Sequence, residues 1–279
     1  MPMKQHTLAS ACFFEGKGLH TGTYAHMSVL PAAAGTGIRF RRTDLPGAPE
    51  VPALAEYVTN TARSTTVSCG AAQAVTTEHI LSALLGLGVD NAVVELDNRE
   101  VPILDGSARL YAEAFRQVGL LEQDAERLFL TLPQALELRD VRSGSRIRIE
   151  PADAPSAEST VDFNSPVLGV QSARWDLDTD YARELAPCRT FCFYREIEGL
   201  LQGGLIKGGD LDNALVVTDT GYLGNPVLHH PDECGRHKLL DLLGDLCLCG
   251  GPLNARVSAY KPGHYLNTQA AKALRALIK

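Results

Sequence analysis

The sequence predicts an α+β protein built from two similar halves, and two observations support this prediction. Residues 79–86 read HILSALLG and residues 237–244 read HKLLDLLG, so both segments follow the pattern His-x-Leu-x-x-Leu-Leu-Gly. Each segment is followed by an Asn-Ala pair, at 91–92 and at 254–255, that resembles the start of a strand after a glycine-terminated helix. Leucine-rich helices can look alike by chance, but the histidines at matching positions favour a duplication.

The length of the chain also favours two domains. It has 279 residues, whereas most single domains hold roughly 100 to 150. The boundary is predicted near residues 122–132, after the helix-like LYAEAFRQVGLL and its charged tail EQDAER. We therefore predict a first domain over residues 1–126 and a second over residues 127–279.

Several short segments have the residue types of β-strands. They are IRFRR (38–42), NAVVEL (91–96), RIRIE (146–150), STVDF (159–163) and ALVVT (214–218). Because these segments do not alternate regularly with helices, they indicate an α+β arrangement and not repeated βαβ units.

The first leucine-rich segment is predicted as a helix that begins close to Glu78 and His79. Either threonine of the pair at 76–77 could cap it, and the glycine at 86 or 88 could end it. Glu78 and His79 would then lie in the first helical turn. The positive end of the helix dipole disfavours a protonated imidazole, so His79 is expected to be neutral and able to bind a metal.

The second leucine-rich segment is predicted as a longer helix with ionisable residues along one edge. Asp232 is the expected N-cap, and the Gly-Gly-Pro sequence at 250–252 is a strong stop signal. His237, Asp241 and Asp245 are spaced four residues apart, which places them on one edge of a helix. The leucines between them are expected to face the core.

Composition indicates a globular protein without a surface for nucleic acid or anionic membranes. Hydrophobic residues make up 45% of the chain, charged residues make up 21%, and the net charge is −7. The N-terminus lacks the apolar core of a secretory signal, and no stretch approaches the ~20 apolar residues of a membrane helix. We therefore expect a soluble cytoplasmic protein with no nucleic-acid partner and no stable membrane insertion.

The cysteines agree with a reducing compartment. There are seven of them, an odd number, and no CxxC pair is present. Five lie in the C-terminal half: Cys188, Cys192, Cys234, Cys247 and Cys249. A structural zinc-thiolate site is one interpretation of this cluster, and small buried residues are the other.

The charged edge of the second helix predicts a metal site. His237 and Asp241 at i and i+4 can ligate one ion, and His79 is the natural third ligand because it occupies the same position in the other half. Two histidines and one carboxylate leave a coordination position open for water, as in catalytic zinc sites. The alternative is that the pair forms only a hydrogen bond or a surface ion pair.

Two further residues could supply acid–base chemistry beside this metal. Glu78 directly precedes a ligand and could act as general base, although a carboxylate at a helix start is often simply solvated. His264 follows Pro262-Gly263 on a predicted turn and could act as general acid, with its ring oriented by Asp245. Activity should then follow a bell-shaped pH profile, with Glu78 on the acidic limb and His264 on the basic limb.

These residues lie in motifs that closely resemble the zinc-dependent UDP-3-O-acyl-N-acetylglucosamine deacetylases of lipid A synthesis in Gram-negative bacteria. The motifs occur in family order over nearly the whole chain: GKGLHTG (16–22), TTEH (76–79), GVDNAVVEL (88–96), EVPILDGSA (100–108), RTF (189–191), GGDLDNA (208–214), RHKLLDLLGDL (236–246) and KPGH (261–264). The resemblance implies two βααβ-type domains packed through their helices, each with a small insertion and with the active site at their interface.

The resemblance also implies a role for each matched residue. Zinc would be bound by His79, His237 and Asp241, while Glu78 acts as base and His264, partnered by Asp245, as acid. Three further matched residues would act on the substrate. The Thr190 hydroxyl would help to stabilise the oxyanion, Lys238 would face the nucleotide-sugar, and Phe191 would lie at the mouth of an acyl passage.

The second insertion, about residues 193–218, would hold the fatty-acyl chain. Its candidate walls are Ile197, Leu200, Ala214 and Val216, although periodicity alone would place these residues in the core. Uridine or diphosphate contacts are expected from Arg146 and Phe163. The chain departs from the common family pattern at Cys192 and Pro262, which bears on acyl-chain preference and leaves every catalytic group in place.

The predicted activity is hydrolysis of the acetamide of UDP-3-O-[(R)-3-hydroxyacyl]-N-acetylglucosamine by a Zn2+ enzyme that we expect to be a monomer. Two other functions are compatible with the same ligands. The site could hold Fe2+ and oxidise its substrate, or the protein could be a non-catalytic binder of nucleotide-sugar or lipid precursors whose metal locks the two halves together. Some relatives continue into a dehydratase domain, for which we expect no room in a chain that ends at Lys279.

Overall fold

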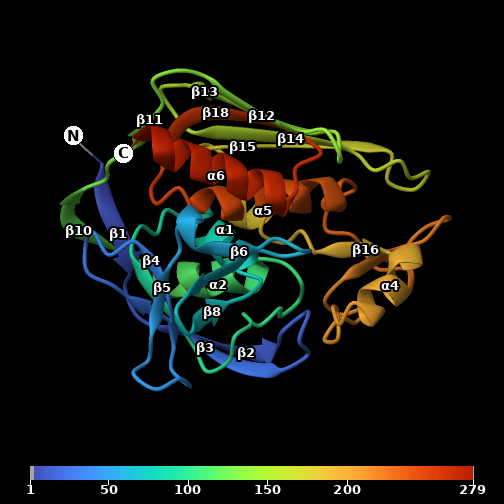
Figure 1. Cartoon of the computed structure of the whole chain (residues 1–279), viewed down its shortest axis with the longest axis horizontal. Coiled ribbons are helices and arrows are strands. Elements are labelled where there is room, and N and C mark those ends of the chain that lie inside the picture. Colours follow the sequence, from blue (N-terminus) through green and yellow to red (C-terminus); the bar gives the residue numbers. More distant parts are fainter. Residues whose placement is uncertain (1–2, 279) are drawn as a thin grey trace.

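The computed structural model describes residues 3–278, in which helices fill the space between two β-sheets (Figure 1). One sheet and its helices come from the first half of the chain, and the other sheet and its helices come from the second half. The first main helix of each half packs against its counterpart at the centre of the molecule. This arrangement confirms the α+β class.

The first sheet has five strands in the order β2-β3-β9-β4-β5. Strands β4 and β9 are parallel, and the other neighbours are antiparallel. The bounds are β2 Cys12–Lys17, β3 Tyr24–Pro31, β4 Ile38–Arg42, β5 Glu50–Pro52 and β9 Ala92–Leu96. Strands β4 and β9 confirm the predictions at 38–42 and 91–96.

The second sheet repeats this topology. Its path is β12-β13-β18-β14-β15, where β18 and β14 are parallel and the other neighbours are antiparallel. The bounds are β12 Leu136–Asp140, β13 Ser145–Pro151, β14 Ser156–Asp162, β15 Val170–Asp176 and β18 Leu253–Tyr260. A short strand, β11 (Leu130–Thr131), also pairs with β18. The strands predicted at 146–150 and 159–163 are thus present.

Each half contributes two main helices, and a strand separates them in sequence. Helices α1 (Glu78–Gly86) and α2 (Arg109–Val118) flank β9, while α5 (Glu233–Cys247) and α6 (His264–Ile278) flank β18. The helices of one half are therefore not consecutive, which differs from the βααβ order expected from the resemblance. In each half the strand that follows the first main helix lies in the middle of its sheet.

Helices α1 and α5 pack closely because a glycine lies at their crossing. A Cβ on Gly244 would overlap the backbone carbonyl group of Glu78. This close approach brings His79 on α1 next to His237 and Asp241 on α5.

Gly244→Ala is therefore expected to destabilise the protein by about 1 to 3 kcal/mol, because the extra methyl group forces the two helices apart. Urea unfolding measures the difference. Gly199→Ala is the matched control, since Gly199 lies in a helix and has open space around its Cβ position. Alanine there should leave the free energy of unfolding unchanged or raise it by up to about 1 kcal/mol. Equal effects of the two substitutions would contradict this account of the helix crossing.

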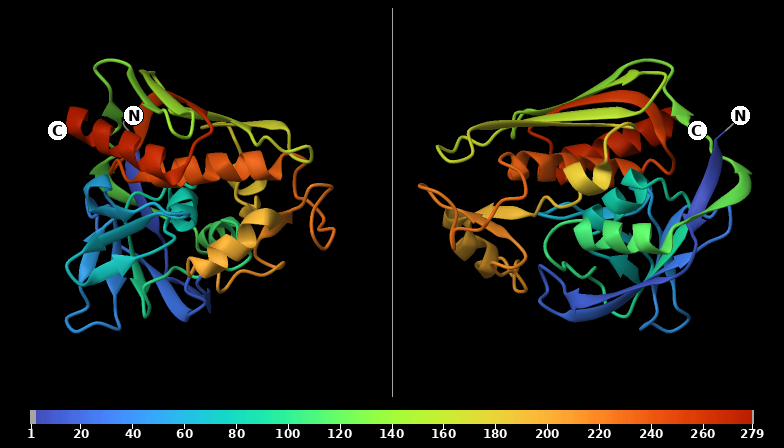
Figure 2. Two further views of the ribbon diagram at one scale, coloured as in Figure 1. Left: turned by 45° about the vertical axis from the view of Figure 1, so that its right-hand side comes forward. Right: turned by 180° about the vertical axis from the view of Figure 1, so that it is seen from behind.

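Two smaller elements project from the repeated core. The first is a three-stranded sheet made of β6 (Val58–Asn60), β7 (Thr66–Cys69) and β8 (Ala72–Ala74), preceded by the short helix η1 (Ala55–Tyr57). The second lies away from the rest of the molecule (Figures 1 and 2) and contains β16 (Phe191–Phe193), η2 (Tyr194–Glu196), α4 (Ile197–Gln202) and β17 (Leu215–Val217). Strand β17 confirms the strand predicted at 214–218. A short helix, α3 (Tyr181–Glu184), precedes this second element.

The prediction that EQDAER (122–127) is a charged tail of the helix is wrong, because most of this segment forms a strand. Strand β10 (Leu120–Glu126) pairs with β1 (Lys4–Leu8), so the segment that follows the first half returns to the N-terminus. Its acidic side chains are compatible with a strand because they face solvent, where Asp124 accepts a hydrogen bond from Lys4. The domain limits at 126 and 127 remain a prediction.

Two local predictions also need correction. His264 is the first residue of α6 and not part of a loop, because the Pro262-Gly263 turn leads directly into that helix. Thr77 and Asp232 occupy the N-cap positions, but neither side chain caps its helix. The Thr77 hydroxyl donates to the Thr65 carbonyl, and the Asp232 carboxylate accepts from Arg236. Within residues 3–278, no helix has the length and apolar character needed to cross a membrane.

Candidate metal centre and active site

The crossing of α1 and α5 brings together the three residues that the sequence predicts as metal ligands. One ligand atom each from His79, His237 and Asp241 lies within 4.8 Å of the other two. Asp241 Oδ1 is 3.4 Å from His237 Nε2 and 3.7 Å from His79 Nε2. All three side chains are buried. Within residues 3–278 this is the one cluster of potential ligands with this geometry, and no cysteine belongs to it.

The donor atoms of this cluster fit a cation. Asp241 Oδ1 is buried without a hydrogen-bond partner among the described residues, and a buried carboxylate oxygen is costly unless something binds it. His237 Nδ1 lies 3.0 Å from the Cys188 carbonyl oxygen, so it carries the proton and donates to that oxygen. The unprotonated Nε2 then faces Asp241, which is the usual orientation of a metal-binding histidine.

The protonation states of the ligands agree with this interpretation. Burial, assisted by the nearby His237, lowers the pKa of His79 to about 3. Burial also lowers the pKa of His237. Burial opposes ionisation of Asp241, but His237 and Lys238 outweigh it and hold the pKa of Asp241 below its usual range. The site therefore offers two neutral imidazoles and one carboxylate.

Glu78 and His264 lie at the edge of the ligand cluster. Glu78 Oε2 accepts a hydrogen bond from the Thr65 backbone N–H at 3.0 Å, and Glu78 Oε1 lies 4.0 Å from His264 Nε2. His264 Nε2 is also 4.0 Å from Asp241 Oδ2. A substrate atom placed between these groups could reach both the predicted base and the predicted acid.

The environments of Glu78 and His264 shift their pKa values in the directions that these roles require. Burial raises the pKa of Glu78 to about 7. Burial alone would lower the pKa of His264, but the charges of Asp245 and Glu78 outweigh it and raise that pKa to about 9. Glu78 therefore loses its proton at a lower pH than His264 does, which is the order that a bell-shaped pH profile requires. The pH profile of activity remains a prediction.

Asp245 orients His264, as the sequence predicts. Its Oδ2 atom accepts hydrogen bonds from His264 Nδ1 at 3.0 Å and from Asn267 Nδ2 at 2.9 Å. Because Nδ1 is held by this carboxylate, Nε2 is the atom of His264 that faces the ligand cluster.

The cluster opens into a cavity of about 280 Å³. Its walls include all three ligands, Glu78, His264, Thr190, Phe191 and Lys238, which are eight of the residues predicted from the sequence. The other wall residues had no predicted site role: Leu19, Arg63, Thr76, Cys192, Phe193, Glu196 and Gly263. Leu19 lies in the GKGLHTG motif, whereas Arg63 and Glu196 belong to no motif and form an ion pair of 3.0 Å across the two halves.

A buried ion pair holds Thr190 and Phe191 at this cavity. The fully buried carboxylate of Glu233 accepts hydrogen bonds from the Arg189 backbone N–H and guanidinium and from the His229 N–H. The Thr190 backbone N–H donates to the Gly106 carbonyl at 2.7 Å. Neither contact could be predicted from the sequence, because the paired residues are 44 and 84 positions apart.

Lys238 lies in the cavity wall but is bound to a ligand. Its Nζ atom donates to Asp241 Oδ2 at 2.7 Å, one turn along α5. The predicted contact with the nucleotide-sugar would require the ammonium group to bridge Asp241 and the substrate.

The structure does not bring every predicted substrate residue to the cavity. Phe163 contacts Phe191 edge to face, with 5.5 Å between the ring centroids, but does not line the cavity itself. Arg146 is exposed on β13. The four candidate acyl walls, Ile197, Leu200, Ala214 and Val216, lie in the projecting element and are not among the cavity residues. Their roles remain predictions.

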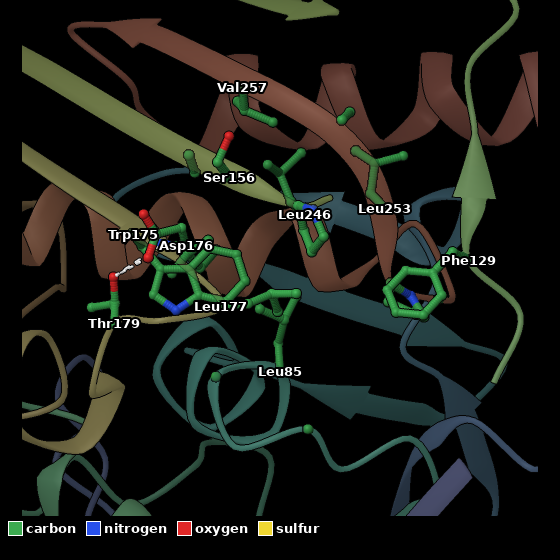
Figure 3. A pocket seen from close by; sticks show the side chains of 18 of the residues that line it. Leu85, Phe129, Ser156, Trp175, Asp176, Leu177, Thr179, Leu246, Leu253 and Val257 are labelled. Atoms are coloured by element: carbon green, nitrogen blue, oxygen red, sulfur yellow. Dashed lines mark hydrogen bonds between the residues drawn. The ribbon is translucent and has the colours of Figure 1, made fainter. Parts of the chain in front are cut away.

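A second cavity, of about 240 Å³, lies farther along α1 and α5 and is mostly apolar (Figure 3). Leu85 from α1 faces Leu246 from α5, and Trp175 closes one side next to the hydrogen bond between Thr179 and Asp176 (Figure 3). None of the predicted catalytic or metal residues lines this space. The candidate general base and general acid therefore both lie at the cavity beside His79, His237 and Asp241.

Comparison with known proteins agrees with the geometry. Residues 5–276 match the family model described as LpxC, UDP-3-O-acyl N-acetylglycosamine deacetylase. The chain belongs to this family. This LpxC-family chain is 43% identical to the UDP-3-O-acyl-N-acetylglucosamine deacetylase of Trichormus variabilis, with 99% of each chain covered. It is also 43% identical to the deacetylase of the same name from an Anaeromyxobacter species, over 98% of this chain and 88% of that protein.

Other relatives are longer. The protein of Chlorobaculum tepidum named bifunctional enzyme LpxC/FabZ is 39% identical over 99% of this chain. The chain spans 65% of the length of that relative.

Proposed function

We propose that this LpxC-family chain hydrolyses the N-acetyl group of UDP-3-O-[(R)-3-hydroxyacyl]-N-acetylglucosamine to the free amine and acetate, an early step of lipid A biosynthesis. The observation that supports this most is the buried cluster of His79, His237 and Asp241 with Glu78 and His264 at its edge. Family membership and the names of the relatives agree with it.

The ion is proposed to be Zn2+, held by His79, His237 and Asp241. Two imidazoles and one carboxylate are a common ligand set of catalytic zinc, and Fe2+ could occupy the same set. When bound, the ion would polarise the acetamide carbonyl and make water more acidic.

Glu78 is proposed as the general base. Its Oε2 atom is held by the Thr65 N–H, which leaves Oε1 directed towards the space beside His264. Deprotonated Glu78 takes a proton from the water that attacks the acetamide carbon. The Thr190 hydroxyl, in the cavity wall, can donate to the oxygen that becomes negatively charged.

His264 is proposed as the general acid. The carbon–nitrogen bond of the amide breaks only when the leaving nitrogen receives a proton, because an amide anion is a very poor leaving group. Asp245 holds the Nδ1 side of His264, so the protonated Nε2 can donate to that nitrogen. The products are then the free amine and acetate.

The lining of the cavity supports an acylated sugar substrate. It combines ionisable groups with the apolar side chains of Leu19, Phe191 and Phe193. The acyl chain is proposed to leave the cavity past Phe191 towards the element at 193–218, while Lys238, Arg146 and Phe163 contact the nucleotide-sugar.

The protein is proposed to work as a monomer in the cytoplasm. All seven cysteines are free thiols, which agrees with a reducing compartment.

The function is tested by assaying acetate release from the acylated UDP-N-acetylglucosamine under nitrogen, without reductant or co-substrate. Full activity is expected there, since hydrolysis needs only water. A chelator should abolish it and added Zn2+ should restore it. A requirement for oxygen would favour the iron oxygenase, and tight substrate binding without acetate release would favour the non-catalytic binding protein.

A further inference from the structure

Thr65 is a fully buried residue that contacts both sides of the proposed acid–base pair. It lies just before β7 and is 0% exposed. Its backbone N–H donates to Glu78 Oε2 at 3.0 Å, and its hydroxyl donates to Asp245 Oδ1 at 2.5 Å. Its carbonyl accepts from the backbone N–H and the hydroxyl of Thr77, next to the start of α1.

These contacts close a ring of four residues. Glu78 is joined to Thr65, Thr65 to Asp245, and Asp245 to His264, whose Nε2 atom returns to within 4.0 Å of Glu78 Oε1. Glu78 comes from α1, Asp245 from α5 and His264 from α6. Thr65 therefore binds side chains of α1 and α5 directly, and it is linked to α6 through Asp245.

The Thr65 hydroxyl fixes the orientation of the Asp245 carboxylate. A threonine hydroxyl has one proton to donate, and an ionised carboxylate only accepts. With Oδ1 occupied by Thr65, Oδ2 is the atom that receives His264 Nδ1 and Asn267 Nδ2. The orientation of the His264 ring thus depends on a hydroxyl 199 positions earlier in the chain.

We propose that Thr65 is a positioning residue of the deacetylase, which holds the general base and the partner of the general acid in one fixed frame. This inference rests on the proposed function. Thr65 does not line the cavity, so it acts on the reaction through Glu78 and Asp245 and not through contact with the substrate.

Thr65→Val tests the hydroxyl because valine has nearly the same shape and keeps the backbone N–H that binds Glu78. Only the donor to Asp245 Oδ1 is lost, so Asp245 and His264 can turn away from their present orientation. We expect kcat to fall by about 10- to 100-fold, since a displacement of about 1 Å in a catalytic group can have an effect of this size. KM should change less than threefold, and bound metal should stay at the wild-type level.

Two further substitutions separate positioning from general stability. Thr65→Ser keeps the donor and should restore kcat to within about threefold of the wild type. Thr7→Val is the matched control, because the Thr7 hydroxyl is also buried and hydrogen-bonded, but to the carbonyl of Asn91 and the N–H of Ala32. Neither partner lines the site cavity, so Thr7→Val should lower the melting temperature and leave kcat unchanged.

The outcomes distinguish this inference from the proposed function. If the wild type releases no acetate, the proposed function fails and the inference fails with it. If the wild type and Thr7→Val are active and Thr65→Val has the same kcat, only the inference fails. If Thr65→Val does not fold, Thr65→Cys replaces it, because its weak S–H donor should give a kcat clearly below that of Thr65→Ser. Equal kcat values for the Cys and Ser variants would overturn the inference.

Discussion

Glu78→Gln should lower kcat by about 10²- to 10⁴-fold while the protein keeps its metal. Glutamine has the shape of glutamate, and its amide oxygen can still accept the Thr65 N–H, so the start of α1 and the position of His79 are preserved. An amide cannot accept the proton of the attacking water. The loss should therefore appear in the chemical step, measured as acetate release per metal-loaded chain.

Glu113→Gln is the matched control for this substitution. Glu113 lies on the exposed side of α2, where it pairs with Arg109, and it does not line the site cavity. Its variant should retain wild-type kcat and wild-type metal content. A Glu78→Gln protein with kcat within threefold of the wild type would remove Glu78 from the mechanism.

Asp241→Ala should abolish both metal binding and activity. Asp241 supplies the single carboxylate of the cluster, and its Oδ1 atom is the one that approaches both histidines. Even a residue that only supports a ligand typically changes metal affinity by about 10- to 100-fold, so removal of a ligand should exceed that range. Equilibrium dialysis against Zn2+ measures the affinity directly.

In the Asp241→Ala variant, loss of metal binding can be distinguished from loss of the fold. Removing the carboxylate leaves Lys238 without its 2.7 Å partner, but that ammonium group can turn towards the cavity. The fold should therefore survive, as circular dichroism would show. Asp153→Ala, at an exposed position, should change neither metal binding nor activity. Zinc affinity in Asp241→Ala equal to that of the wild type would contradict the ligand assignment.

The ligand set could be predicted because its signal is local. His237 and Asp241 are four residues apart on one helix, and His79 occupies the equivalent position in the repeated segment. The structure explains why His79 and His237 are equivalent. Both halves have the same strand order, and α1 and α5, the first main helix of each half, cross at Gly244. Asp245 follows from the same helical spacing, and Glu78 could be predicted because it directly precedes a ligand.

The residues that support the site could not be predicted, because their contacts join distant parts of the chain. Thr65 meets Asp245 across 180 positions, and Arg63 meets Glu196 across 133. No periodicity relates such pairs, and a threonine before a strand looks like any other strand residue. The strand at 120–126 was missed for a related reason, since its partner is β1 at the opposite end of the first half.

The most direct test of the account is to measure zinc content and acetate release on the same samples of wild type, Glu78→Gln and Asp241→Ala. We expect zinc and activity together in the wild type, zinc without activity in Glu78→Gln, and neither in Asp241→Ala. Activity without zinc in Asp241→Ala, or full activity in Glu78→Gln, would contradict a hydrolase whose metal lies at the crossing of the two repeated helices.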